Sequence, residues 1–266
     1  MANTCLNCGC TIIENFCSNC GQKKFKRIDK KYVTEELQYL LVHTNKGFLY
    51  SIKKIIKNPG KTAREFIDGN RVNHYKPMLL TFVLSGISAF ISFKVIGFQK
   101  LLKEFYAAEE ISSPFMDDLM SIYSGYNSLI MLAFIPIFAL VTWISFIKWK
   151  HNYYEHIVMN AYILSFQTLA SIIVFSPFLY FFRENSAIVN VIVSAITLII
   201  LPTFVWFFRG FYADKPFKQI LLRTLAVIGL VMVAFFLTMI LTALGGVIYA
   251  LIKGPEALEY IRPKGT

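Results

Sequence analysis

The chain has 266 residues, of which 56% are hydrophobic and only 16% are charged, and its mean hydropathy is +0.53. These values exclude an ordinary soluble protein and a disordered chain, and they predict an integral membrane protein. At about twenty residues per span, five or six helices leave no room for a large soluble catalytic domain. The net charge of +11 is typical of Lys and Arg in cytoplasmic loops, which argues against a nucleic-acid partner.

All five cysteines lie within residues 1–22, and four of them form two CxxCG motifs. The glycine after each motif favours a tight turn that points two thiolates at one ion, so two such turns predict a zinc ribbon. The predicted ligands of a structural Zn²⁺ are Cys5, Cys8, Cys17 and Cys20. Iron in a rubredoxin-like site and disulfide or redox chemistry are the alternatives. We interpret Cys10 as a bystander or a minor alternative ligand.

Four thiolates leave no open position for a substrate, so the predicted metal is structural rather than catalytic. A module of this size is typical of a small surface presented to a protein or a nucleic acid. A cap that only stabilises the N-terminus is the alternative.

Residues 23–76 form a basic neck that carries 14 Lys and Arg against 5 Asp and Glu. Apolar residues at spacings of three and four predict amphipathic helices over 33–41 and 48–56, the second ended by Asn58-Pro59-Gly60. Such helices are typical of the cytoplasmic membrane surface, and partner binding is the alternative. A third short helix is expected to close at Gly69, before a turn that leads to Pro77.

Basic side chains in the second half of the neck are candidates for binding a phosphate or an anionic lipid headgroup. These candidates are Lys61, Arg64, Arg71, His74 and Lys76. Anchoring by positive charge on the cytoplasmic side explains the same residues without a specific ligand.

The order of these motifs resembles an uncharacterised family of bacterial inner-membrane proteins that is catalogued only as a domain of unknown function. The resemblance rests on the doubled CxxCG followed by Gly21-Gln22, on Asn58-Pro59-Gly60-Lys61, on the REFIDG run at 64–69 and on Tyr75-x-Pro77. It covers residues 5–95 and implies a bacterial inner-membrane location and a zinc ribbon. It implies no reaction and no substrate.

Five apolar runs predict transmembrane helices at about 78–98, 126–147, 157–182, 188–208 and 225–252. The last run is longer than the bilayer core, so it tilts, projects into water or breaks near Gly245-Gly246. The predicted fold is an all-α polytopic membrane protein with five transmembrane helices. The predicted parts are the ribbon at 1–22, the amphipathic juxtamembrane neck at 23–76, the bundle at 77–253 and a short tail at 254–266.

The distribution of charge predicts the orientation of the bundle. Twenty Lys and Arg fall on the side of the N-terminus and six on the other side, so we expect a cytoplasmic N-terminus and an external C-terminus. The external segment 99–124 is acidic. It is expected to hold one helix over 99–110 and another that begins at Ser113-Pro114.

One polar cluster at the start of the third span could be chemical. Glu155 with His156 could supply acid–base chemistry at the cytoplasmic boundary, or bind a metal together with His74. Anchoring of aromatic and charged residues at the interface is the alternative.

These patterns favour a non-enzymatic inner-membrane protein. Its cytosolic zinc ribbon and basic neck would recruit or sense a partner, with the bundle as anchor or regulator. A small transporter or lipid-handling protein is the alternative, indicated by Pro136, Pro177 and Pro202, which could kink three spans and open a cavity. A membrane enzyme that acts on a lipid through Glu155 and His156 is a third hypothesis. The sequence predicts no oligomeric state.

Overall fold

The computed structural model describes residues 4–24, 27–33, 47–108, 113–254 and 260, and most of these residues are helical. The helices of the N-terminal half are α2 (Phe48–Lys57), α3 (Pro59–Ile67), α4 (Pro77–Ala89), the π-helix η1 (Phe90–Ile96), α5 (Phe98–Ala108) and α6 (Pro114–Phe146). They are followed by the 3₁₀-helix η2 (Ile147–Trp149), α7 (Tyr153–Ala170), the π-helix η3 (Ser171–Phe175), α8 (Ser176–Phe182), α9 (Ser186–Phe211) and α10 (Phe217–Lys253). Most of the helix expected over 33–41 lies outside the described residues.

Among the described residues, five helical segments are long and apolar enough to cross a membrane. They are Pro77–Ile96, Pro114–Trp149, Tyr153–Phe182, Ala187–Phe211 and Phe217–Tyr249. Each contains most of one predicted span, so the expectation of five membrane-crossing helices is confirmed at the level of length and composition. A break near Gly245-Gly246 does not occur, and α10 continues as one helix through these residues to Lys253.

Several helix boundaries follow from local sequence. Ser113 caps α6 by accepting a hydrogen bond from the Met116 N–H at 3.3 Å, and Pro114 occupies the first helical position, as the sequence predicts. The α6 helix leaves helical geometry at Tyr126, where the predicted span begins. In the third span, Pro177 lacks an N–H and crowds the carbonyl four residues earlier, which accounts for the π-helical turn of η3 directly before it.

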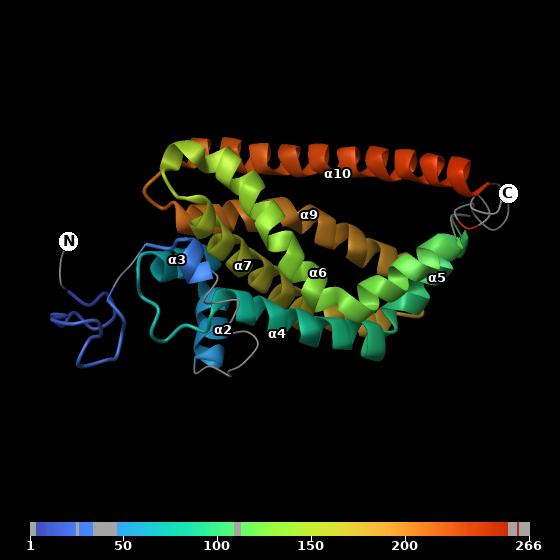
Figure 1. Ribbon diagram of the computed structural model, residues 1–266. Helices are drawn as coiled ribbons and strands as arrows, with labels where there is room; N and C mark the ends of the chain where they lie inside the picture. The colour runs from blue at the N-terminus through green and yellow to red at the C-terminus, as the bar shows by residue number, and fades with distance from the viewer. Residues whose placement is uncertain (1–3, 25–26, 34–46, 109–112, 255–259, 261–266) are drawn as a thin grey trace.

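The spans run side by side between two opposite ends of the molecule (Figure 1). Residues 4–24, α2 and α3 lie at one end, and α5 and the end of α10 lie at the other. Helices α4, α6 and α7 pack against one another, and α10 packs against α6 and α9. The core of this packing includes Leu80, Leu84, Ile135, Ala139 and Tyr162, all nearly inaccessible to solvent.

Helix α2, one of the two helices expected along the membrane surface, packs against α3 and α7 with its Ile55 side chain buried, and its contact with a membrane stays a prediction. Helix α3 packs against both α7 and α9, and its Ala63, Phe66 and Ile67 side chains are buried. The close approach depends on Gly60, since a Cβ added there would lie 1.9 Å from the Phe207 carbonyl oxygen of α9. Helix α3 of the basic neck is therefore held directly against the backbone of α9.

Candidate metal centre

The N-terminal cysteine module, residues 4–24, consists of two halves with the same hydrogen bonds twelve residues apart. In the first half the Cys5 N–H donates to the Cys10 carbonyl at 2.7 Å, and the Gly9 N–H donates to the Cys5 carbonyl at 2.9 Å. In the second half Cys17 pairs with Gln22 and Gly21 pairs with Cys17, at the same two distances. Each half is also closed by one isolated β-bridge, between Thr4 and Thr11 in the first and between Phe16 and Lys23 in the second.

Glycine is required at the end of each turn. Gly9 and Gly21 have φ values of 78° and 71°, a region that side chains with a Cβ rarely adopt. The sequence motif CxNCG recurs in both halves, so the repeated local structure follows from repeated local sequence.

The two turns bring four sulfur atoms together. The Sγ atoms of Cys5, Cys8, Cys17 and Cys20 all lie within 4.8 Å of one another, and they could hold a metal ion. The Cys5–Cys20 and Cys8–Cys17 sulfur pairs are each 3.5 Å apart. A tetrahedron of sulfurs about 2.3 Å from a central ion has edges of about 3.8 Å, so the spacing fits four-coordination. Cys10 is outside this group of four, and its carbonyl closes the first turn.

The thiols of the group differ in their ease of deprotonation. A hydrogen bond from the Asn7 side chain lowers the pKa of Cys20 to about 6, whereas burial raises the pKa of Cys5 to about 11. A bound cation favours the thiolate form of every ligand, so metal binding would release protons.

The cysteine module is attached to the turn that follows α3. The Gln22 side-chain amide donates a hydrogen bond to the Gly69 carbonyl, and the Asn73 amide donates to Asn7 Oδ1 at 3.2 Å. Asn7 thus contacts both a cysteine of the candidate metal centre and the turn that leads into α4. The sequence motifs gave no indication of this role for Asn7, Gln22 and Asn73, because the contact joins residues that are far apart in the chain.

A second attachment lies just after the module. The Arg27 guanidinium forms an ion pair with Glu155 at 2.9 Å and donates a hydrogen bond to the Lys150 carbonyl, also at 2.9 Å. The Asn152 amide donates to the carbonyl of Ile28, whose side chain is completely buried. Arg27 and Ile28 therefore lie against the start of α7.

The basic side chains of the neck that are candidates for anion binding differ in their contacts and in their exposure. Arg71 donates hydrogen bonds to the Phe66 and Ile67 carbonyls and so closes the C-terminus of α3, while Arg64 pairs with Asp68 at 2.7 Å. Lys61 is exposed and Lys76 is half-buried. Binding of an anionic headgroup by these side chains stays a prediction.

His74 is buried among aromatic rings. Its ring packs edge-on against Tyr50, Phe66 and Tyr162, and its Nδ1 atom lies 3.4 Å from the Tyr162 hydroxyl. Burial lowers the pKa of His74 to about 4. The ring is therefore neutral at physiological pH, and its contacts are those of a core residue.

Glu155 and His156, the candidate acid–base pair, have separate partners. Glu155 pairs with Arg27, and its second carboxylate oxygen accepts a hydrogen bond from the Asn152 N–H at 2.8 Å, which completes a capping box for α7. The His156 ring points into the bundle, where its Nδ1 atom lies 3.0 Å from the Thr142 hydroxyl.

Comparison with known proteins finds a match for one segment of the chain. A family model described as "Protein of unknown function (DUF3667)" matches residues 45–89, which include α2, α3 and α4. This part of the chain is similar to an uncharacterised family. The cysteine module lies outside the matched range, but the turn to which it is attached lies inside it. No curated protein and no solved structure matches the chain.

Proposed function

We propose that the chain is a non-enzymatic bacterial inner-membrane protein whose cytosolic zinc ribbon and basic neck recruit or sense a partner. In this proposal the bundle serves as an anchor or as a regulator. The observation that carries this proposal is the group of four cysteine sulfurs within 4.8 Å, in a module attached to the turn after α3. These sulfurs could hold an ion, and the module that carries them is attached to a turn within the range that the family model matches.

Zinc is the proposed metal, and its proposed role is structural. Four thiolates in a tetrahedron are typical of structural Zn²⁺ sites, in which no coordination position is left for a substrate. A module of about twenty residues buries too little apolar surface to fold alone, so the ion would supply its folding free energy. The ribbon would then act through its surface rather than through chemistry at the metal.

The proposed orientation places the cysteine module in the cytoplasm. The cysteine module and the end of α10 lie at opposite ends of the bundle (Figure 1), and the end with the cysteine module is also the end rich in Lys and Arg. A membrane-impermeant maleimide applied to intact cells should label Glu184→Cys. The same reagent should label neither the native cysteines nor Lys148→Cys. Labelling of the native cysteines from outside would reverse the orientation.

The test of recruitment compares proteins that co-purify with three forms of the chain in mild detergent. These are the native chain, a Cys17→Ser/Cys20→Ser variant that lacks two candidate ligands, and a Cys10→Ser control that keeps all four. We expect one abundant protein to be lost from the double variant and retained by the control. An identical set of proteins in all three samples would contradict recruitment through a metal-loaded ribbon.

A lipid-handling function is the second candidate, and one observation favours it. A hollow of about 710 Å³ lies between the second half of α10 and the start of α6, with Phe115, Phe235, Met239 and Gly246 among its lining residues. This volume lies within the range of about 300–1,000 Å³ found for ligand pockets. Native mass spectrometry should show a retained lipid in the parent chain and none in a Gly246→Trp variant that fills the hollow. Equal lipid retention by both would remove this candidate.

A further inference from the structure

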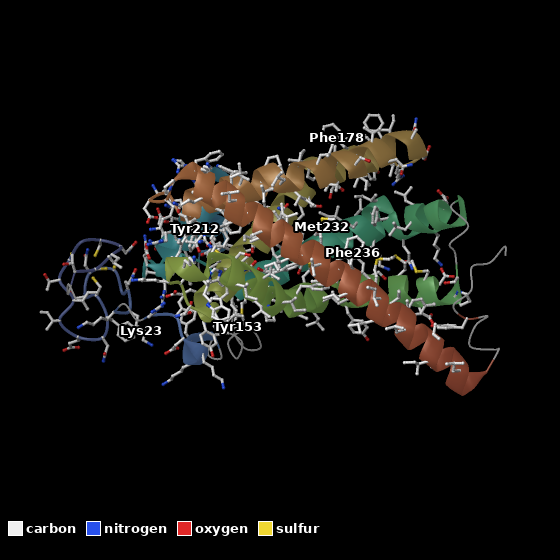
Figure 2. All side chains as sticks on the ribbon, turned by 90° about the horizontal axis from the view of Figure 1, so that it is seen from above. Lys23, Tyr153, Phe178, Tyr212, Met232 and Phe236 are labelled. Atoms are coloured by element: carbon white, nitrogen blue, oxygen red, sulfur yellow. The ribbon has the colours of Figure 1, made fainter. Side chains whose placement is uncertain are left out.

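Three buried polar atoms without a hydrogen-bond partner lie in one aromatic cage at the ribbon end of the bundle. They are His151 Nδ1, His156 Nε2 and the Tyr212 hydroxyl. The ring centres of His151 and His156 are 6.4 Å apart, and those of His151 and Tyr212 are 5.5 Å apart. Figure 2 shows Tyr212 at this end of the bundle, far along the molecule from Phe236.

The walls of the cage are aromatic and offer these atoms no hydrogen bond. The ring centres of Phe146, Trp149 and Phe211 lie 4.9, 4.5 and 4.7 Å from that of Tyr212. Buried polar groups in proteins are almost always hydrogen-bonded, if necessary to ordered water. Three unpaired polar atoms in one cage therefore indicate a shared small ligand.

The protonation of His156 follows from its neighbour Thr142. The Thr142 hydroxyl has one hydrogen, and the Phe138 carbonyl, one helical turn earlier, lies 3.0 Å away to accept it. The same oxygen then accepts hydrogen bonds from the Asn160 amide at 2.7 Å and from His156 Nδ1 at 3.0 Å. With its proton on Nδ1, His156 presents a bare lone pair at Nε2. Tyr212, in contrast, offers a proton, so the ligand must both donate and accept.

We propose that one buried water molecule links His151, His156 and Tyr212. It accepts a hydrogen bond from the Tyr212 hydroxyl and donates its two hydrogens to the free imidazole nitrogens. Buried waters typically form about three such bonds to groups that would otherwise be unpaired. The linked residues come from the loop before α7, from α7 itself and from the end of α9, the two helices on which α3 packs.

The distance between the imidazole rings supports water over a metal ion. A hydrogen bond of about 2.9 Å, plus about 1.1 Å from ring nitrogen to ring centre, places each ring centre about 4.0 Å from the water. At a tetrahedral angle the two centres would then be about 6.5 Å apart, close to the observed 6.4 Å. With metal–nitrogen bonds of about 2.1 Å, a tetrahedral ion would bring the centres to about 5.2 Å, and only a linear arrangement would reach 6.4 Å.

The surroundings of Tyr212 also oppose a metal ion. Burial raises the pKa of the Tyr212 phenol above its ordinary value, which disfavours the phenolate that a metal would bind. The guanidinium groups of Arg64 and Arg223 lie over rings of the cage, at 5.8 and 4.9 Å from the centres of Phe211 and Trp149. A second cation at this point would be repelled by both.

The test is whether Tyr212→Phe lowers or raises the Tm of the full chain. If the water is present, Tyr212→Phe removes a satisfied hydrogen bond and should lower Tm by about 2–4 °C. If the cage holds no ligand, the same substitution removes an unpaired buried hydroxyl and should raise Tm, which would overturn the proposal. The control is Tyr180→Phe on α8, whose side chain is 41% exposed. It should leave Tm unchanged.

Two further measurements are independent of stability. A high-resolution map of the full chain should show one density peak within hydrogen-bond distance of all three atoms, and its absence would overturn the proposal. Metal analysis of a variant with Cys5, Cys8, Cys17 and Cys20 all replaced by Ser should find no bound ion. A retained equivalent that is lost on His156→Gln would overturn the proposal in favour of a metal site.

Discussion

The contact between α3 and α9 can be tested by adding a single methyl group. A Cβ at Gly60 would lie 1.9 Å from the Phe207 carbonyl oxygen and 2.7 Å from the Phe211 amide nitrogen. Both are backbone atoms of α9, so no side-chain rotation can relieve the overlap. The Gly60→Ala substitution must therefore move α3 away from α9 by at least about 1 Å, since optimal nonbonded separations are about 3.5 Å.

The cost of that displacement can be worked from general values. Overpacking by one methyl group costs about 1–3 kcal/mol, and the upper end applies here because the opposing atoms are backbone. Ala63 and Phe66, which are buried on the same helix, lose part of their packing when α3 moves. We expect a loss of about 3 kcal/mol, which corresponds to a fall in Tm of about 6–12 °C.

Thermal unfolding of the detergent-solubilised protein, followed by tryptophan fluorescence, measures this difference. The matched control is Gly229→Ala in α10, where an added Cβ meets nothing within 4 Å. That change should leave Tm unchanged or raise it, because alanine favours helix by about 1 kcal/mol over glycine. A Gly60→Ala protein as stable as the Gly229→Ala control would refute the close packing of α3 on α9.

Three other predictions follow from the neck and the cysteine module. Because burial holds the pKa of His74 at about 4, against about 6.5 in the unfolded chain, acidification protonates the unfolded state first. Stability should fall by about 2 kcal/mol between pH 7.5 and pH 5, and His74→Gln should reduce that fall; an unchanged pH dependence would contradict the burial of the neutral ring. Asn7→Ala should increase amide hydrogen exchange in residues 69–76, whereas Asn19→Ala, the exposed equivalent twelve residues later, should not; equal effects of the two would argue against docking through Asn7. Cys10→Ser should keep a full equivalent of bound metal by elemental analysis, and loss of the metal would make Cys10 a ligand.

Features that depend on neighbouring residues could be predicted from the sequence. Ser113-Pro114 starts a helix and Gly9 and Gly21 adopt positive φ because each requirement is local, and the apolar runs locate the five membrane-crossing helices for the same reason. The grouping of the four cysteine sulfurs was predictable as well, since each CxxCG motif brings two of them together.

Features that depend on tertiary contact could not be predicted. The amphipathic pattern of the neck shows that one face of each helix is apolar, but not whether lipid or protein covers it. The deciding residue for α3 is Gly60, whose role depends on the α9 backbone about 150 residues later. The position of His151 beside His156 and Tyr212 could not be predicted either. It depends on how α7 packs against the end of α9, which the sequence of each helix alone does not show.

The length and the uneven packing of α10 affect how the protein would respond to bilayer thickness. In α10 the buried residues Ile220, Thr224 and Val227 all lie in the first third, and beyond Val231 no described side chain is buried. Met232 and Phe236 lie on this unpacked part (Figure 2). The helix of 37 residues is about 55 Å long. If α10 crosses the membrane as proposed, a thinner bilayer would be matched by a tilt of its unpacked part about the packed end. A change in lipid composition that thins the bilayer would then alter the angle between α10 and the rest of the bundle. The α4–α6–α7 core and the cysteine module attached to it would keep their geometry.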